Sequence, residues 1–181
     1  MLRDYLIEKL SKVIDLSNSR ILDIGCGSGR IAKLLGDQVK SYTGIDKDKE
    51  ILKKAKSEFS KFEFKYGSAE KIPYKIRFDI VFFSMSWHIV KDFKLALEEV
   101  KRVLNKEGIL VILEPSEETT NWSSPKLRKD NPEFDEIIYN DKLKCLKLAE
   151  NYLKNQTIFK IVLEDYNKET KNKIWILKLF F

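Results

Sequence analysis

The segment ILDIGCGSGR, residues 21–30, decides the fold class of this chain. It begins with a short apolar run that is typical of a buried strand, passes through three glycines, and leads into the helical pattern IAKLLGD. Gly25 and Gly27 allow the backbone to turn sharply and to approach a ligand to a distance that a Cβ would block. A strand, a tight glycine turn and a helix start, in this order, predict a nucleoside-binding turn.

Strand and helix patterns alternate on both sides of this segment. Strands are expected over 20–24, 41–45, 62–66, 78–84 and 109–114, and helices over 2–14, 31–37, 48–59, 92–104 and 134–155. Glu107 and Gly108 are expected to turn the chain into its fifth strand, and the β-rich runs 157–166 and 173–181 indicate an antiparallel pair whose last run is apolar enough to be interior. We therefore predict one domain over residues 1–181, with a doubly wound, Rossmann-like α/β fold. Its seven-stranded sheet is mostly parallel, ends in the antiparallel pair, and carries helices on both faces.

The spacing of the glycines discriminates between cofactors. The dinucleotide fingerprint G-x-G-x-x-G requires glycine at position 30, where this chain has Arg30, and its third glycine is Gly29. No glycine is followed by lysine and a hydroxyl residue, as a phosphate loop requires. Binding of NAD, of FAD or of a pyrophosphate at this turn is therefore disfavoured.

Asp46 stands 23 positions after Asp23, at the end of the second expected strand. A carboxylate at this place can accept charge-assisted hydrogen bonds from both hydroxyls of a ribose. The alternative is a turn or helix-cap residue in front of DKEILKKA. The glycine turn followed by a spaced acid favours the ribose interpretation.

Composition limits the class of protein. With 181 residues and 43% hydrophobic content, the chain can bury a core without disulfides or metals. Arg3, Asp4 and Glu8 interrupt the first apolar residues, which is unlike a secretory signal, and the longest uncharged run, 80–90, is too short to span a bilayer. We expect a cytoplasmic protein with no membrane contact. Two distant cysteines and one histidine are too few for a structural zinc site, so no metal is expected.

Thirty-four basic and 28 acidic residues give a formal charge of +6. Lysines are interleaved with acidic residues in segments such as KDKEILKKAKSEFSK, which is typical of solvated helix faces. A basic surface that meets nucleic acid is the alternative that this charge leaves open.

The chain resembles the class I S-adenosylmethionine-dependent methyltransferases, especially the small ubiquinone-biosynthesis-like type. The resemblance is carried by ILDIGCGSG and GIDKD, and it continues through GSAEKIPY, FDIVFFSMSWHIV and LEEVKRVLNKEGILVILEP. The order of these segments is specific for the family and covers most of the chain. It implies S-adenosylmethionine as the cofactor.

The resemblance also implies roles for individual residues. The residues that would line the methionine part of the cofactor are Asp23, Gly25, Cys26, Gly27 and Gly29. Asp46 would hold the ribose and Lys47 would flank the adenine. Where the family usually has an aspartate that binds the adenine amino group, this chain has Ser68, whose hydroxyl can still accept a hydrogen bond, while the backbone amide of Ala69 can serve the ring. Ser84, at the end of the fourth strand, completes the expected cofactor-binding set.

Residues 84–88 follow the fourth strand at the sheet edge where open α/β folds bind ligands, so we expect them to wall the acceptor pocket. His88, the one histidine, is the candidate catalytic base, with packing in a helical turn as the alternative. Trp87 could stack on a flat acceptor or belong to the core. The N-P-P-[YF] sequence that marks methylation of an amino nitrogen on adenine or glutamine is missing, since residues 84–87 read SMSW. Covalent cytosine methylation needs a cysteine nucleophile near the pocket, and Cys26 and Cys145 are poorly placed for that role.

Three functions remain open on the sequence. A methyltransferase for a small molecule is favoured, because the whole length is used by the catalytic fold. An RNA or protein methyltransferase with a basic surface, and a non-catalytic cofactor-binding partner subunit, are the alternatives. Lids are expected in the leading helix around Tyr5 and in the polar stretch 116–133 around Trp122, although either could be a packing helix or a plain loop. The acceptor and the oligomeric state stay open.

Overall fold

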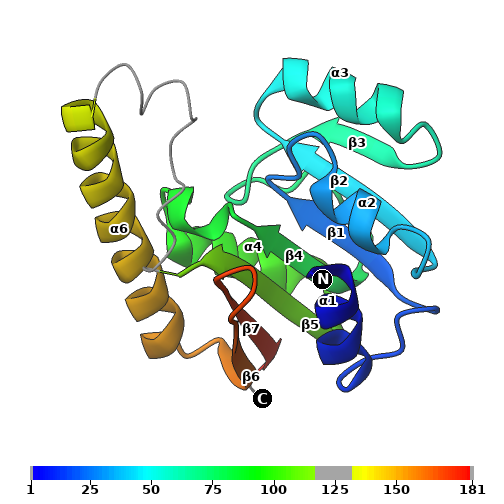
Figure 1. The fold of residues 1–181 in the computed structure, drawn as a ribbon. Helices are drawn as coiled ribbons and strands as arrows, with labels where there is room; N and C mark the ends of the chain where they lie inside the picture. The colour runs from blue at the N-terminus through cyan, green and yellow to red at the C-terminus, as the bar shows by residue number, and fades with distance from the viewer. Residues whose placement is uncertain (1, 117–131, 180–181) are drawn as a thin grey trace.

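A computed structural model describes residues 2–116 and 132–179 and confirms the alternation of strands and helices (Figure 1). The first half of the chain contains α1 (Leu2–Ser11), β1 (Arg20–Ile24), α2 (Arg30–Leu35), β2 (Ser41–Asp46), α3 (Lys49–Glu58) and β3 (Glu63–Tyr66). The second half contains β4 (Phe78–Ser84), the short 3-10 helix η1 (Trp87–Ile89), α4 (Phe93–Val103), β5 (Leu104–Pro115), α6 (Pro132–Asn155), β6 (Phe159–Asn167) and β7 (Asn172–Leu179).

The strands form one seven-stranded sheet in the order β3-β2-β1-β4-β5-β7-β6. β1 to β5 are parallel to one another, whereas β7 is antiparallel to both β5 and β6. The predicted fold class is confirmed, including the interior position of the last strand. β7 is interior because Ile174 and Ile176 are buried on one face of the sheet and Trp175 and Leu177 on the other.

Helices cover both faces of the sheet, and each face has its own apolar core. α1, α2 and α3 pack on one face through residues such as Leu6, Ile31 and Leu52, and α1 and α2 lie in front of the sheet in Figure 1. On the other face, α4 and α6 contribute residues such as Leu97 and Leu153. Strands buried on both faces explain the unbroken apolar runs of β4 and β5 in the sequence.

Local sequence sets the starts of two helices. The side chain of Asp48 accepts hydrogen bonds from the backbone N–H groups of Glu50 and Ile51, which caps α3. Asp92 caps α4 in the same way by accepting from Leu95. Both caps begin a helix just beyond the edge of the sheet where a site is expected.

One local expectation is wrong. Glu107 and Gly108 do not form a turn before the fifth strand, because β5 already begins at Leu104, directly after α4. The pairing of β4 with β5 instead shifts register, from Phe78 opposite Leu104 to Ile80 opposite Ile109. The extra residues of β5 form an irregularity in this pairing, and their polar sequence NKEG resembles that of a turn.

The strand order places a topological switch point between β1 and β4. The chain passes from β1 outward to β2 and β3, and from β4 in the opposite direction to β5. The loops at the carboxyl ends of β1 and β4 therefore diverge, which opens a crevice that open α/β sheets use for ligands.

Candidate ligand-binding site

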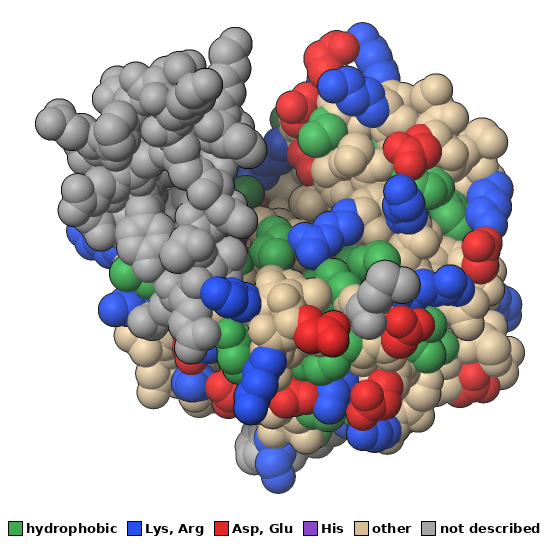
Figure 2. Space-filling view, viewed as in Figure 1, with side chains coloured by type: hydrophobic (Ala, Val, Ile, Leu, Met, Phe, Trp, Pro, Cys, Tyr) green, Lys and Arg blue, Asp and Glu red, His purple; other side chains and the backbone are tan. Residues whose placement is uncertain are grey.

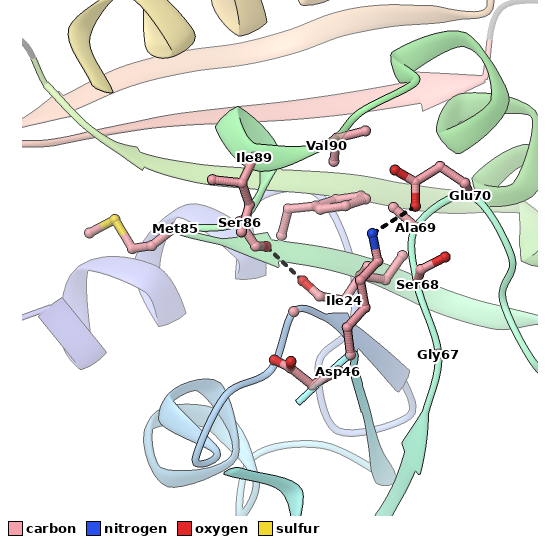
Figure 3. A pocket seen from close by; sticks show the side chains of 13 residues that line it. Ile24, Asp46, Gly67, Ser68, Ala69, Glu70, Met85, Ser86, Ile89 and Val90 are labelled. Atoms are coloured by element: carbon pink, nitrogen blue, oxygen red, sulfur yellow. Dashed lines mark hydrogen bonds and ion pairs between the residues drawn. The ribbon is translucent and has the colours of Figure 1, made fainter. Parts of the chain in front are cut away.

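A pocket lies at the carboxyl ends of β1, β2, β3 and β4, at this switch point (Figure 3). The residues that line it are Ile24, Gly25, Asp46, Lys47, Gly67, Ser68, Ala69, Glu70, Phe83, Met85, Ser86, Ile89 and Val90. Apolar side chains and backbone make up most of the wall, and three charged side chains interrupt it. This is the composition of a pocket that orients a ligand through a few polar groups.

The glycine turn forms the floor of the pocket and is fixed by the neighbouring strands. The backbone N–H groups of Gly25 and Cys26 both donate to the carbonyl oxygen of Ile45, at 2.8 and 3.0 Å. Gly25 has a φ of +72°, and a Cβ at this position would lie 2.5 Å from the Cβ of Ser86. The Ser86 hydroxyl in turn donates to the carbonyl oxygen of Ile24 at 2.6 Å (Figure 3). Only glycine fits here, since both the conformation and the space exclude a side chain.

Asp46 stands at the end of β2, facing the pocket and the glycine turn. One carboxylate oxygen accepts from the backbone N–H of Gly27 and the other from that of Asp48, both at 2.9 Å. These bonds fix the carboxylate between the two turns while leaving lone pairs on both oxygens. The carboxylate therefore faces the pocket with free acceptor positions, as binding of two ribose hydroxyls requires.

Lys47 and Glu70 form an ion pair on the wall beyond Asp46, with 3.3 Å between Nζ and Oε2 (Figure 3). Burial raises the pKa of Glu70, but hydrogen bonds from backbone N–H groups, including that of Lys91, and from the side chains of Ser68 and Lys47 outweigh it. The result is a pKa of about 2. Glu70 is therefore a fixed negative charge on the pocket wall at neutral pH.

Asp23 lies beneath the glycine turn and is fully buried. The hydroxyl of Tyr42 donates to its Oδ2 at 2.6 Å, whereas Oδ1 has no hydrogen-bond partner. Burial raises the pKa of Asp23 to about 7, against the opposing effect of the Tyr42 hydrogen bond. Because β1 alternates its side chains between two faces, Asp23 packs with the α1, α2 and α3 layer and not into the pocket.

The structure brings five of the predicted site residues together around the pocket and places six elsewhere. Gly25, Asp46, Lys47, Ser68 and Ala69 line the pocket, whereas Asp23, Cys26, Gly27, Gly29, Ser84 and His88 do not. Gly27 still contacts the site, because its backbone N–H donates to Asp46. The Cys26 side chain is buried in the core on the α1, α2 and α3 face of the sheet. Contact of any of these residues with a cofactor stays a prediction.

His88 is held by Glu114, at the carboxyl end of β5. Its Nδ1 lies 2.6 Å from Glu114 Oε2, and the other carboxylate oxygen accepts from the backbone N–H groups of Trp87 and His88, at 2.7 and 3.3 Å. Both side chains are nearly buried. This arrangement favours a role in fixing η1 over one in proton transfer, and the catalytic role of His88 stays a prediction.

Trp87 belongs to the core. Its ring is 1% exposed, packs against Phe83 and Phe93, and donates from Nε1 to the carbonyl oxygen of Ala149 in α6. Stacking on an acceptor is therefore ruled out for this ring in the present conformation.

Several lining residues were not predicted from the sequence, among them Ile24, Gly67, Glu70, Phe83, Ile89 and Val90. Glu70 carried a signal, because it belongs to the GSAEKIPY segment, but a glutamate among other charges does not stand out. Ile89 and Val90 line the pocket because η1 turns the chain back over it, and a three-residue 3-10 helix leaves no periodic pattern.

The two expected lids have different outcomes. Tyr5 is not among the residues that line the pocket. Its helix, α1, packs on the sheet face that also carries α2 and α3, and Lys9 of α1 pairs with Asp165 of β6. α1 is a packing helix in this structure. The stretch around Trp122 lies outside the described residues.

The comparison with protein families identifies the class of this chain. A family model described as a methyltransferase domain matches residues 15–160. The chain belongs to the class I S-adenosylmethionine-dependent methyltransferases. The match includes the glycine turn, the strands β1 to β5 and the residues that line the pocket. It therefore agrees with the resemblance seen in the sequence.

Curated relatives include quinone-related enzymes. The chain is 30% identical over 105 residues to the demethylmenaquinone methyltransferase of Thermotoga maritima, covering 56% of this chain and 46% of that protein. It is 29% identical over 116 residues to the ubiquinone biosynthesis O-methyltransferase of Pelagibacter ubique, covering 62% and 48%. The chain thus spans less than half the length of these two relatives.

Solved structures share the fold. An S-adenosylmethionine-dependent methyltransferase from Clostridium acetobutylicum superimposes with a TM-score of 0.68 at 14% identity, over 99% of this chain and 91% of that one. A methyltransferase of the same cofactor class from Aquifex aeolicus gives 0.69 at 18% identity, over 96% and 88%. The sheet and its helical layers are therefore those of methyltransferase domains.

Two features are absent from residues 2–116 and 132–179. No helix there is long and apolar enough to cross a membrane. No group of three or more His, Cys, Asp or Glu side chains in the same residues is placed to hold a metal ion.

Proposed function

We propose that this chain binds S-adenosylmethionine in the pocket and transfers its methyl group to a small-molecule acceptor. The observation that carries the proposal is the Asp46 carboxylate, held between the glycine turn and the start of α3 by two backbone N–H groups. Charge-assisted hydrogen bonds from ribose hydroxyls to such a carboxylate orient a nucleoside.

The residues of the pocket fit this cofactor. At Gly25 a Cβ would fill the floor, so the turn keeps its backbone open to close approach. The ribose would lie at Asp46, and the adenine beyond it, between Lys47 and the wall made by residues 67–70. The methionine part would lie along the glycine turn toward Ser86, where the pocket wall passes from β1 to β4.

When bound, the cofactor supplies a sulfonium-activated methyl group and leaves as a neutral thioether, so the reaction generates no new oxyanion to stabilise. The work of the protein is then alignment, which can contribute about 7 to 11 kcal/mol. Gly25 and Asp46 fix one reactant, while Met85, Ile89 and Val90 offer an apolar wall for the other. A side-chain base is required only for an acceptor that arrives protonated.

A small apolar acceptor fits the described face of the site. Ile89 is 67% exposed at the rim of the pocket, where it extends the apolar wall formed with Met85 and Val90. One relative is named for demethylmenaquinone and another for ubiquinone biosynthesis, which favours a small-molecule acceptor here too. Figure 2 shows Lys and Arg interspersed with Asp and Glu on this face, not gathered as a nucleic-acid surface would gather them. A cytoplasmic location goes with this proposal.

The experiment that tests the proposal is transfer of a labelled methyl group. The protein is incubated with methyl-labelled S-adenosylmethionine and a cell extract separated into RNA, protein and small-molecule fractions. We expect label in the small-molecule fraction, and its loss when excess S-adenosylhomocysteine is added. Label in the RNA fraction, or binding of the cofactor with no label in any fraction, would contradict a small-molecule methyltransferase.

A further inference from the structure

Glu70 is the charged pocket residue for which the proposed function gives no role. Of the three charged side chains that line the pocket, Asp46 accepts from two backbone N–H groups of the turns beside it. Glu70 stands farther along, on the wall of residues 67–70. That wall is tied to Asp46 because the N–H of Gly67 donates to the carbonyl oxygen of Asp46 at 3.1 Å. Whatever continues past Asp46 along this wall therefore meets Glu70.

The surroundings of Glu70 hold its carboxylate in one place and in one charge state. Oε1 accepts from the backbone N–H of Lys91 at 3.1 Å, and Oε2 lies 3.3 Å from the Lys47 ammonium. The side chain is only 15% exposed. Donors from two different loops thus fix an acceptor on the pocket wall, which is how a recognition group is preorganised.

The backbone of Ser68 is already paired within its own loop and offers no free donor to a ligand. Its backbone N–H and carbonyl oxygen are both used in a bridge with Lys71, at 3.4 and 3.3 Å. Its hydroxyl is uncharged, whereas the Glu70 carboxylate is ionised, because its pKa is lowered to about 2. A donor on a ligand that reaches this wall therefore finds the Glu70 carboxylate as the strongest acceptor.

The Lys47 ammonium is paired with the Glu70 carboxylate, and a ligand can displace it. Its Nζ lies 3.3 Å from Glu70 Oε2, and its side chain is 52% exposed. Because the ammonium end of this pair is half exposed to solvent, the pair contributes little and the ammonium is replaced at low cost. A carboxylate also has about four acceptor positions, so one N–H donor of a ligand can be added beside the existing partners.

We propose that Glu70 determines nucleobase specificity by accepting a hydrogen bond from an exocyclic amino group. The inference rests on the proposed function, because it requires the ribose at Asp46 and the base beyond it. An ionised carboxylate accepts hydrogen bonds and donates none, so it favours an amino purine and repels the carbonyl oxygen of an oxo purine. Adenine meets this requirement and hypoxanthine does not.

The test compares two ligands that differ only at this group. Dissociation constants of S-adenosylhomocysteine and S-inosylhomocysteine are measured by calorimetry for the wild type, Glu70→Gln and Glu107→Gln. Glu107 is an exposed glutamate near the opposite end of β5 and serves as the matched control. We expect the wild type and the control to prefer the adenosyl ligand by about tenfold or more. Glu70→Gln, whose amide can donate as well as accept, should bring the two constants within about threefold.

Each outcome separates this inference from the proposed function. If the wild type binds neither ligand, the proposed function fails. If the wild type binds both ligands equally, or if Glu70→Gln keeps the wild-type ratio, the specificity role fails while cofactor binding stands. Should Glu70→Gln unfold in a thermal scan, Glu70→Asp replaces it. This shorter acid keeps the charge but withdraws the acceptor, and should also reduce the ratio.

Discussion

The glycine-turn side of the pocket and the η1 side use their buried polar groups in opposite ways. On the first side, Asp46 and Glu70 face the pocket and keep acceptor capacity beyond their bonds to nearby N–H groups. On the second side, Glu114 is turned inward and collects three donors from η1. A carboxylate that keeps free acceptor positions at a cavity indicates ligand binding. A carboxylate whose acceptor positions are used by donors of the protein itself indicates a structural role. The two sides should therefore respond differently to mutation.

Glu114→Ala should have the largest effect on folding. It leaves the N–H groups of Trp87 and His88 and the His88 ring without their buried partner, which we expect to lower the free energy of unfolding by about 4 kcal/mol. Denaturant unfolding measures this, with the exposed Glu107→Ala of the same strand as the control. A loss below about 1 kcal/mol would show that η1 does not depend on Glu114.

Gly25→Ala should damage folding less and binding more. The new Cβ would meet Ser86 at 2.5 Å in a left-handed backbone, at a cost of about 3 kcal/mol, and it would block the floor of the pocket. Gly27→Ala is the matched variant, since its Cβ meets only Ile51 at 3.7 Å and the cost is limited to about 1 kcal/mol of backbone strain. Equal free energies of unfolding for the two variants would show that the contact with Ser86 does not destabilise Gly25→Ala.

Asp23→Asn should remove a pH dependence of stability. The pKa of Asp23 is raised to about 7 in the folded protein, so between its ordinary value and pH 7 the folded state binds a proton that the unfolded state has lost. Stability is therefore lost as pH rises, by about 2 kcal/mol between roughly pH 5 and 6.5. The variant should lack this component. A wild type and a variant with parallel stability profiles would show that Asp23 is ionised in the fold.

Lys47→Met should have the smallest effect. The Lys47 side chain is half exposed and its pair with Glu70 is worth about 1 kcal/mol or less, so unfolding should hardly change, and S-adenosylhomocysteine should still bind. A loss of stability above about 1 kcal/mol, measured beside Lys53→Met of the exposed pair with Glu50, would mean that the ion pair holds the pocket wall together.

The sequence predicted the fold well because the fold depends on patterns that a sequence carries. Apolar runs bounded by turns gave all seven strands, and the excess apolarity of the last run gave the interior position of β7. The start of β5 was missed because an irregularly paired stretch of strand contains the same polar residues as a turn. Chain-local signals cannot distinguish the two without knowledge of the partner strand.

The site was predictable only where residues act through the backbone or at a strand end. Gly25 and Asp46 could be placed because a glycine turn and a strand terminus have fixed positions in the fold. Which face Asp23 occupies, and that Glu114 would hold His88, depend on pairs 19 and 26 residues apart meeting in three dimensions. Those contacts leave no mark in a single sequence.

Calorimetric titration with S-adenosylhomocysteine tests the central claim, that the Asp46 carboxylate beside the glycine turn holds the ribose of an adenosyl ligand. We predict one-to-one binding to the wild type and to Asp37→Asn, a surface control, and at least about tenfold weaker binding to a folded Asp46→Asn. Absence of heat at millimolar ligand, or undiminished affinity of Asp46→Asn, would contradict the account.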